Sequence, residues 1–539
     1  MPITQVLSKN AQLYPNEVSL VERQPAIDSR REITWLEFEN QSNKIANALI
    51  EYGVKKGDRV VLLLMNSLEW LPCYFGVLKT GALAVPLNFR FTAEEIKKCT
   101  AVAQPKVFIY GPEFCDRIAQ IRNDLDYIDK FIFVEQGFDI NYLDCSKLNK
   151  DIASNRPDGY VTYADLVEKY PSDAPDIQIT DDDDAALYFT SGTTGMPKPI
   201  ILTHNNLMSA CITEHKHHHQ THDDNFLCIP PLYHTGAKMH WFGNLLVGAK
   251  AVILKGVNPK WILEAVSQEK VTIVWLLVPW AQDILDAVER GEINLDDYEI
   301  SQWRLMHIGA QPVPPSMIKR WKEYFPGQMY DTNYGLSEST GPGCVHLGIE
   351  NIHKVGAIGV PGFGWQAMVV DSLGNPVPDD TVGELIVKGP GVMKGYYKNP
   401  QATAEVLRNG WLYTGDMAKK DAEGFIYLVD RKKDVVISGG ENIFPVEIEN
   451  FLLTHNDIKD SAVIGMPDRR LGEIPVAVIE LKTGRNLTKE MVADFCRALP
   501  RYKRPRIIIF DKVPRNATGK IEKPKLRKKW CQGTGALYA

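Results

Sequence analysis

The sequence predicts an α/β fold: a large N-terminal domain of layered α/β subdomains plus a small antiparallel β subdomain, followed by a small α+β C-terminal domain. Short β-rich runs alternate with amphipathic stretches through the first two thirds of the chain, which favours mainly parallel sheets covered by helices. From Gln366 to Val429, strands follow one another with turns and little helix, which favours an antiparallel sheet. A charged run, Arg431–Asp434, then precedes a compact β-α pattern.

The individual elements follow from the periodicity of the apolar residues. In the first part, strands are expected at Val60–Met65, Lys106–Tyr110, Lys130–Val134 and Ala186–Thr190, with helices at Trp35–Tyr52 and Ala93–Ala101. Val271–Ala281 is expected to be a buried strand that runs into a helix. In the antiparallel part, strands are expected at Gln366–Asp371, Gly383–Lys388 and Gly424–Asp430.

The domain boundary is expected at the charged run. A chain of 539 residues is too long for one hydrophobic core, because cores stop growing at roughly 250–300 residues. Residues 1–430 would form the N-terminal domain, 431–434 a hinge, and 435–539 the C-terminal domain. The last segment, about 105 residues, has a normal size for a separate domain.

The composition excludes several classes of protein. With 44% hydrophobic and 24% charged residues, the chain is neither disordered nor fibrous. Its net charge of −6 argues against a general nucleic-acid binder, which would be basic. The first ten residues lack a secretory signal, and the longest apolar runs fall short of the ~18 residues of a membrane span. Nine cysteines without a CxxC pair favour reduced thiols, so a cytoplasmic protein is expected.

A loop rich in glycine and hydroxyl groups, Ser191–Lys198, follows the expected strand at Ala186–Thr190. Glycine lets backbone N–H groups approach an anion, hydroxyls add donors, and lysine adds a positive charge. The loop is not a Walker loop, which needs lysine directly after its second glycine. The pattern therefore predicts a phosphate site, and the alternative is a flexible polar turn.

The segment Tyr188–Lys198 resembles the signature loop of the adenylate-forming superfamily, which includes acyl- and aryl-CoA ligases, luciferases and peptide-synthetase adenylation domains. Other motifs of that superfamily follow in order over nearly the whole chain. They are the acyl-pocket motif Pro231–Gly236, the adenine turn Gly309–Pro312, the tyrosine-to-glutamate motif Asn333–Glu338, the ribose motif Tyr413–Asp416, the hinge Asp430–Asp434, and two motifs of the mobile domain, Ser438–Asn442 and Pro514–Lys520. Pro199 departs from the usual glycine and should stiffen the exit of the loop.

The resemblance implies an acid:CoA ligase (AMP-forming). Such an enzyme activates a carboxylic acid with Mg-ATP to an acyl-adenylate plus pyrophosphate, and then forms acyl-CoA plus AMP. The chain is closest in character to medium-chain or aryl and alicyclic acid ligases, so a compact aromatic, alicyclic or short-to-medium-chain aliphatic acid is expected. Two alternatives stay open: transfer of the acyl group to a carrier protein or to oxidation, and a catalytically silent acyl-nucleotide sensor. The expected partners are the acid, ATP and CoA, with the chain a monomer or homodimer.

The resemblance also implies a nucleotide site. Glu338 would hold Mg²⁺, which prefers carboxylate oxygens together with substrate phosphates. Asp416 would accept hydrogen bonds from the ribose diol, with helix capping as its alternative role. Lys520 would bridge the acyl carboxylate and the α-phosphate, because a cation between two anions offsets their repulsion. The implied catalytic residues are Lys520, Glu338, Thr190 and Lys198. The implied nucleotide-binding residues are Thr190, Ser191, Gly192, Thr193, Thr194, Gly195, Lys198, Gly309, Ala310, Gln311, Pro312, Asn333, Tyr334, Gly335, Ser337, Asp416, Arg431 and Lys520.

The acid and CoA sites are implied by weaker matches. The residues implied for the acyl pocket are His234, Trp241, His307, Asn333 and Gly335, although Trp241 has a core tryptophan as its alternative reading. Those implied for CoA are Gly439, Gly440, Glu441, Arg501, Lys503, Arg504 and Arg90. Lys433 is the implied pivot of the hinge. Most of the basic residues after Arg501 would form a solvated face.

A histidine-rich run, His215–His222, suggests a metal site, since His215/His219 and His218/His222 have helical i,i+4 spacing. No cysteine or carboxylate completes a tetrahedral set at the spacing of a structural site. We therefore expect a helix end on the surface here, with metal binding as the alternative.

Overall fold

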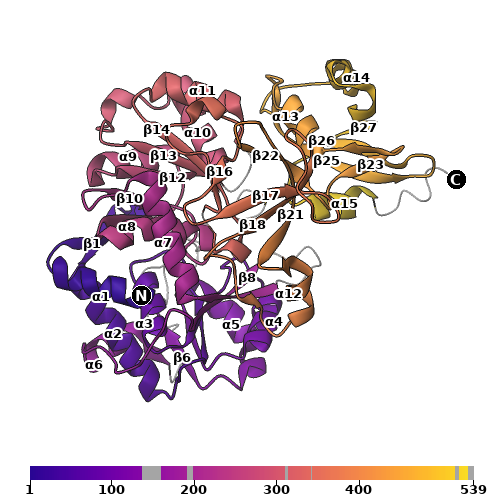
Figure 1. Ribbon diagram of the computed structural model, residues 1–539. Coiled ribbons are helices and arrows are strands. Elements are labelled where there is room, and N and C mark those ends of the chain that lie inside the picture. The colour runs from indigo at the N-terminus through magenta and orange to yellow at the C-terminus, as the bar shows by residue number, and fades with distance from the viewer. Residues whose placement is uncertain (136–159, 191–197, 310–312, 342, 516–520, 532–539) are drawn as a thin grey trace.

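The computed structural model describes residues 1–135, 160–190, 198–309, 313–341, 343–515 and 521–531. These residues form an α/β protein with a large N-terminal domain and a smaller C-terminal domain, at the upper right of Figure 1. Four sheets organise the described part of the chain.

One sheet carries the strands on either side of the signature loop. Its parallel strands β3 to β6 are buried, as strands covered by helices on both faces are. The strand order is β19 (Gly395–Tyr396), β9 (Lys198–Thr203), β8 (Asp184–Thr190), β4 (Leu83–Pro86), β3 (Arg59–Leu63), β5 (Val107–Tyr110), β6 (Lys130–Phe133) and β7 (Val161–Thr162). β8 and β9 are antiparallel, so Thr190 faces Lys198 across the base of the loop.

The second large sheet carries three of the other motifs at or after its strand ends, Pro231–Gly236, Gly309–Pro312 and Asn333–Glu338. Its strand order is β16 (Val360–Pro361), β15 (Val345–His346), β14 (Met329–Tyr334), β13 (Leu305–Gly309), β12 (Ile273–Leu277), β10 (Asn225–Cys228), β11 (Lys250–Leu254), β1 (Val18–Gln24) and β2 (Ser29–Thr34). The central strands from β1 to β14 run parallel, so their carboxyl ends share one edge of the sheet. Ligands of open α/β sheets bind at this edge.

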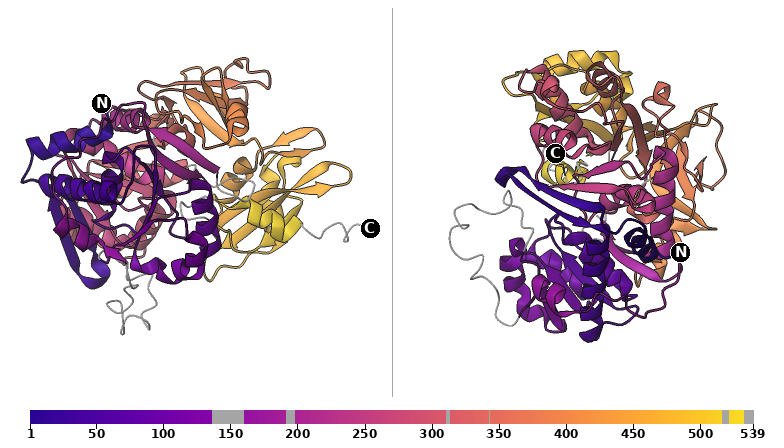
Figure 2. Two further views of the ribbon diagram at one scale, coloured as in Figure 1. Left: turned by 90° about the horizontal axis from the view of Figure 1, so that it is seen from below. Right: turned by 90° about the vertical axis from the view of Figure 1, so that its left-hand side faces the viewer.

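Two smaller sheets complete the fold. An antiparallel sheet contains β17 (Gln366–Val370), β18 (Gly383–Lys388), β21 (Trp411–Lys420), β20 (Leu407–Arg408) and β22 (Ile426–Arg431). The C-terminal sheet contains β24 (Glu441–Ile443), β23 (Val436–Ser438), β26 (Gly472–Leu481), β25 (Ile458–Asp468) and β27 (Ile507–Phe510). The C-terminal sheet has hydrophobic cores of its own, and Figure 2 shows it as a separate body beside the N-terminal domain.

The helices begin where the sequence supplies caps. Thr34 and Glu37 form a capping box at the start of α2, and Thr203 caps α7 by accepting from the Asn206 amide. The described α-helices are α1 (Ile3–Leu13), α2 (Trp35–Glu51), α3 (Trp70–Lys79), α4 (Ala93–Ala103), α5 (Cys115–Ile121), α6 (Tyr163–Lys169), α7 (His204–His218), α8 (Thr235–Val247), α9 (Pro259–Glu269), α10 (Val278–Glu289), α11 (Pro315–Tyr324), α12 (Pro400–Val406), α13 (Pro445–Leu452), α14 (Lys489–Phe495) and α15 (Lys523–Cys531).

The predicted elements are confirmed. Every strand expected from the periodicity is present with ends within two residues of the expected ones, and Val271–Ala281 contains β12 and the first residues of α10, which follows it directly. The antiparallel part between Gln366 and Asp430 is likewise confirmed. None of the described helices combines the length and the apolar composition that crossing a bilayer requires.

Candidate active site

Asp416 is held between an arginine and a tyrosine. The register of β21 and β22 puts Asp416 opposite Arg431, and Arg431 Nε lies 3.0 Å from Asp416 Oδ1. The Tyr334 hydroxyl, from the end of β14, donates to Asp416 Oδ2 over 2.6 Å. Burial and the nearby Asp416 carboxylate raise the pKa of Tyr334 well above its usual value, so the phenol keeps its proton and acts as the donor. The arrangement fixes a carboxylate that can accept further hydrogen bonds from a diol.

A depression of about 370 Å³ adjoins this carboxylate. Its lining consists of Thr414, Gly415, Arg431, Lys432 and Lys433. Gly415 has φ +73°, a conformation that favours glycine, and its amide donates to Glu384 over 3.1 Å. Three of its lining residues are cations, which favours an anionic ligand, although Arg431 and Lys432 also pair with Asp416 and Glu384.

The two ends of the signature loop lie beside the expected magnesium ligand. The Thr190 hydroxyl donates to the Lys198 carbonyl over 3.1 Å. Lys198 Nζ lies 5.3 Å from the ring centroid of Tyr396, whose hydroxyl donates to Glu338 Oε1 over 3.1 Å. Glu338 lies in the short 3₁₀ helix Ser337–Ser339, and the Thr235 hydroxyl donates to Ser337 Oγ over 3.4 Å.

The residues around Glu338 fit a magnesium ion by their chemistry. A hard cation is usually held by one or two carboxylates together with substrate phosphates, and Glu338 is a half-buried carboxylate beside the loop. Lys198 adds a positive charge for the phosphates. Tyr396 is a residue that the sequence analysis missed, because it lies outside every motif and reaches the site only through the pairing of β19 with β9.

The residues implied for the acyl pocket are only partly brought together. His234 caps α8 by accepting from the Gly236 amide, with 3.3 Å between Gly236 N and His234 Nδ1. A Cβ added at Gly236 would lie 3.2 Å from the ring of Trp275, and one added at Gly309 would lie 3.7 Å from Trp275 Nε1 and 3.6 Å from Asn333 Oδ1. Trp275, on β12, therefore faces both glycines. Sequence reasoning missed it because it reads as one more residue of a buried strand.

Trp241 lies elsewhere, whereas His307 lies beside Trp275 in the register of β12 and β13, with 6.5 Å between their ring centroids. Trp241 is fully buried in the hydrophobic core, with its ring centroid 5.8 Å from that of Phe242. Its neighbour His240 is the residue of α8 that faces Trp275, with 4.3 Å between ring centroids. His307 is fully buried, and its ring centroid lies 4.5 Å from those of His218 and His240.

The sequence analysis expected a helix end on the surface at the histidine-rich run, but part of the run is buried. His218 is fully buried, with Nε2 2.7 Å from Asp331 Oδ2 and Nδ1 3.2 Å from Glu214 Oε2. The carboxylates that meet the run could not be recognised from its spacing. Glu214 lies one turn earlier on α7, and Asp331 arrives from β14, 113 residues away in sequence.

These groups belong to what we call the buried histidine cluster, whose members are Glu214, His218, His240, His307, Asp331 and His346. Burial disfavours a charge on His218, but Glu214 and Asp331 outweigh it and raise the pKa of His218 to about 10. Burial alone would raise the pKa of Asp331, yet His218 and His346 hold it well below its usual value.

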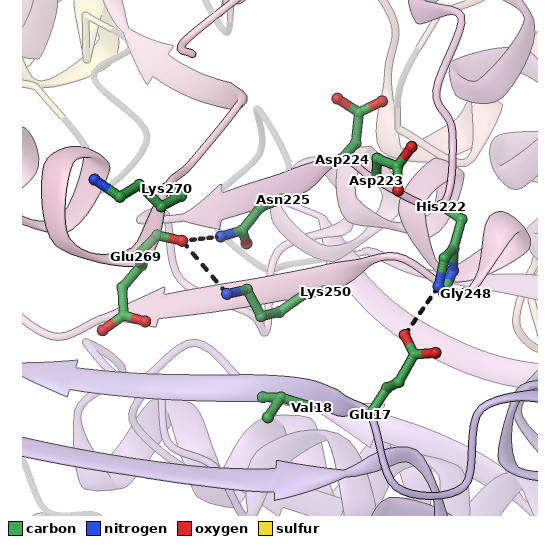
Figure 3. Close-up of a pocket in the computed structure, with 10 residues that line it drawn as sticks. All are labelled: Glu17, Val18, His222, Asp223, Asp224, Asn225, Gly248, Lys250, Glu269 and Lys270. Carbon is green, nitrogen blue, oxygen red and sulfur yellow. Dashed lines mark hydrogen bonds and ion pairs between the residues drawn. The ribbon is translucent and has the colours of Figure 1, made fainter. Parts of the chain in front are cut away.

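The end of the histidine-rich run is partly exposed. Figure 3 shows His222 beside Glu17 at a surface depression of about 380 Å³, with Glu17 Oε2 2.9 Å from His222 Nε2. In the same depression the Glu269 carbonyl accepts from Asn225 and Lys250. None of the residues that line it was implied for substrate binding.

The segment joining the domains turns tightly. The Asp434 amide donates to the Arg431 carbonyl over 2.8 Å, with Lys433 inside this turn, and burial lowers the pKa of Lys433. Arg527 of α15 lies 2.7 Å from Asp434. Asp430 accepts from the amides of Arg431 and Val446, over 2.7 and 2.9 Å.

The ionisation of Asp430, in the segment that joins the domains, makes the stability of the protein depend on pH. Burial raises the pKa of Asp430 to about 6, although the charge of Lys523 opposes the rise. Between its ordinary pKa of 3.8 and about 6, the folded chain keeps a proton that the unfolded chain loses, so stability falls as pH rises through this window. At 1.36 kcal/mol for each pH unit, ionisation costs about 3 kcal/mol.

Replacing Asp430 by asparagine removes this titration. We expect the difference in Tm between the wild type and Asp430→Asn to shift in favour of the variant as pH rises from 4 to 7. Differential scanning fluorimetry at half-unit steps measures it. The lost acceptor shifts the variant's Tm by an amount that does not depend on pH, so a pH-independent difference would contradict the prediction.

The residues implied for CoA lie mainly on the C-terminal domain. Gly439 and Gly440 form the turn between β23 and β24, with φ +60° and +90°. Lys503 pairs with Glu447, and Arg504 donates to the carbonyls of Leu499 and Arg497, whereas Arg501 and Glu441 are exposed. Arg90 is exposed on the N-terminal domain, with its guanidinium 5.6 Å from the ring centroid of Phe89.

Several predicted site residues lie outside the described residues. They are Ser191, Gly192, Thr193, Thr194 and Gly195 of the loop, Ala310, Gln311 and Pro312 of the adenine turn, and Lys520.

Comparison with known proteins identifies the family. The model of the AMP-binding enzyme family matches residues 7–397, and that of the AMP-binding enzyme C-terminal domain matches 447–520. A feruloyl-CoA synthase of Amycolatopsis is 34% identical over 92% of this chain and 94% of its own. The long-chain-fatty-acid–CoA ligase FadD13 of Mycobacterium tuberculosis is 29% identical over 97% of this chain and 98% of its own.

Among solved structures, the anthranilate CoA ligase AuaEII in complex with anthranoyl-AMP superposes with a TM-score of 0.86 at 26% identity, covering 98% of this chain and 97% of its own. Enzymes of this kind use ATP and CoA as co-substrates together with Mg²⁺. The matches and the residues gathered around Asp416 and Glu338 agree: the chain belongs to the AMP-binding enzyme family and is an AMP-forming acyl-CoA synthetase of the adenylate-forming superfamily.

Proposed function

We propose that the chain forms the CoA thioester of a compact aromatic, alicyclic or short-to-medium-chain carboxylic acid. The observation that carries this proposal is Trp275, whose indole fills the space in front of Gly236 and Gly309. An indole at this place limits how far an acyl chain can extend past the two glycines. The similarity to a feruloyl-CoA synthase and to an anthranilate CoA ligase supports a compact acid, while the similarity to FadD13 keeps a long chain as the competing candidate.

In the first half-reaction, a carboxylate oxygen of the acid attacks the α-phosphorus of ATP, and pyrophosphate leaves. We assign the ribose to Asp416, with Tyr334 and Arg431 holding the carboxylate in place. Thr190 and Lys198 would bind the phosphates, and Lys520 would lie between the acid and the α-phosphate. Bound Mg²⁺ would offset the phosphate charge, and Glu338 is the residue that would hold it.

In the second half-reaction, the CoA thiolate attacks the carbonyl carbon of the adenylate, and the bond to AMP breaks. We propose that residues 435–539 form a mobile domain that rotates about Lys433 between the two steps. The turn Gly439–Glu441 would then line the path of the thiol, and the exposed Arg501 and Arg90 are candidates to bind the CoA phosphates. One site would thus serve two reactions, because each needs a different group at the same place.

We place the chain in the cytoplasm as a monomer or homodimer. The described cysteines are all free, which fits a reducing compartment.

A panel of acids tests the function. Release of AMP is measured with benzoate, cyclohexanecarboxylate, hexanoate and palmitate, each with and without CoA. We expect CoA-dependent release with kcat/KM at least about 10-fold higher for the compact acids than for palmitate. A preference for palmitate would contradict the compact acid. Release without any CoA dependence would favour the other fates of the adenylate.

A pair of tryptophan variants tests the pocket wall. In Trp275→Leu, kcat/KM for longer acids divided by kcat/KM for compact acids should rise by about 10-fold, because a larger pocket discriminates less against long acyl chains. Trp241→Leu is the matched control, since it removes another buried indole, and we expect it to lower Tm without changing the acid preference. If Trp241→Leu changes the preference and Trp275→Leu does not, Trp241 is the pocket residue.

A further inference from the structure

The buried histidine cluster is not needed for any step proposed above. Its carboxylate Glu214 lies on α7, His240 on α8 and His307 on β13. Glu214 and His307 are fully buried and His240 is 2% exposed. The cluster therefore places several ionisable groups in the interior, away from solvent.

The distances within the cluster match those between the ligands of one metal ion. Glu214 Oε2 lies 3.1 Å from His240 Nδ1 and 3.8 Å from His307 Nδ1, and ligand atoms of the three residues all lie within 4.8 Å of one another. Around a tetrahedral ion with bonds of ~2.0–2.2 Å, neighbouring ligand atoms are about 3.3 Å apart. Two imidazoles and a carboxylate are a common ligand set for zinc.

Pairing within the cluster accounts for only part of the close approach. Glu214 Oε2 is at ion-pair distance from His240 Nδ1, 3.1 Å, and from His218 Nδ1, 3.2 Å. Both ring nitrogens of His307, however, lack a hydrogen-bond partner within the described residues. Buried polar atoms in folded proteins nearly always have a partner, so their convergence points to a ligand.

Outer contacts orient the cluster as they do in metal sites. The Asn333 amide donates to Glu214 Oε1 over 3.3 Å, and so holds the carboxylate from its other oxygen. Asp331 binds His218 Nε2 at 2.7 Å and His346 Nδ1 at 3.1 Å, while the Gly348 amide donates to Asp331 over 2.9 Å. These pairs hold His218 and His346, whose rings lie 4.5 and 6.5 Å from that of the proposed ligand His307.

We propose that Glu214, His240 and His307 bind one divalent transition-metal ion, with Zn²⁺ the ion that best fits this donor set. His218, which lies 3.2 Å from Glu214 Oε2 and 2.7 Å from Asp331 Oδ2, would hold the carboxylate in place from outside the set of ligands. The ion would join α7, α8 and β13 two residues before Gly309. It would be distinct from the Mg²⁺ at Glu338 and would act by holding these elements together, without contact with the reacting atoms.

Zinc content per chain tests the proposal. The wild type, Glu214→Gln, His240→Asn and a double control, His215→Gln/His219→Gln, are stripped with a chelator, dialysed against Zn²⁺ and freed of loosely bound ion. Mass spectrometry then gives zinc per chain. We expect about one zinc in the wild type and in the control, and a loss of affinity of about 10–100-fold or more in the two cluster variants.

The double control separates the buried site from the i,i+4 pair of the same run, in which His215 is half-buried and His219 exposed. Zinc lost from the control but kept by His240→Asn would overturn the proposal, as would equal zinc in all four proteins. So would the absence of zinc from the reloaded wild type, which would leave the cluster a network of charges alone.

A second measurement covers variants that fail to fold. Co²⁺ loaded into the stripped wild type should give the visible absorption bands of a tetrahedral site, and Zn²⁺ should displace them. Zn²⁺ should also raise the Tm of the stripped wild type by about 2 °C or more, because an ion that binds only the folded state stabilises it. No bands and no change in Tm would overturn the proposal without reference to any variant.

Discussion

Replacing Lys520 by alanine is expected to slow adenylate formation by about 10²–10³-fold, while thioester formation from supplied acyl-adenylate stays near the wild-type rate. A donor aimed at developing charge in a water-poor site contributes ~2.7–4 kcal/mol. The affinity for ATP should change far less, because Asp416, Arg431 and Lys198 remain. Single-turnover assays of each half-reaction measure the two effects separately.

The residues on either side of the segment that contains Lys520 are held by contacts that do not involve Lys520. Arg515 and Ile521 pair as an isolated antiparallel bridge, and Arg515 Nε lies 2.6 Å from Asp460 Oδ2. Arg515 and Ile521, which flank the segment that contains Lys520, are thus held by contacts that Lys520→Ala leaves intact. Lys528→Ala, an exposed lysine on α15, is the matched control and should leave both rates unchanged. Normal adenylation by Lys520→Ala would refute the catalytic role, and a parallel loss of both steps would refute the two-conformation scheme.

Residues that lie within a motif could be predicted because short-range geometry positions them. Tyr334 ends β14 and Glu338 follows it at the carboxyl edge of the parallel strands, whereas Asp416 lies within the antiparallel strand β21, opposite Arg431. The strands and helices themselves follow from apolar periodicity and from caps such as Thr34 and Thr203.

Residues that reach the site through pairing of distant segments could not be predicted. Tyr396 contacts Glu338 only because β19 adds to the edge of β9. Glu214 and Asp331 are unremarkable in sequence, the first inside a helix and the second inside a strand, yet His218 bridges them. Trp275 likewise has the pattern of a core residue. No local signal separates a buried side chain that faces a ligand from one that faces the core.

A glycine variant with no change of charge should have an effect of comparable size to that of Lys520→Ala. A Cβ added at Gly335 would lie 1.7 Å from the Gly341 carbonyl oxygen and 2.9 Å from its carbon. Backbone atoms must therefore move. They are constrained, since the Gly341 amide donates to the Leu336 carbonyl over 2.7 Å and the Leu336 amide donates to Ser339 Oγ over 2.8 Å.

Gly335→Ala is expected to slow adenylation by about 10²-fold and to lower stability by about 1–3 kcal/mol. The moving segment joins Tyr334, which holds Asp416, to Glu338, and a displacement near 1 Å of positioning groups is enough for such a loss. The matched control is Gly327→Ala, where an added Cβ meets nothing within 4 Å and φ lies outside the glycine-specific region. ATP–pyrophosphate exchange and Tm, measured for both variants, decide the matter. A wild-type rate of exchange in Gly335→Ala would contradict this prediction. It would mean that the turn at Gly335 can change its backbone conformation without moving the Glu338 carboxylate.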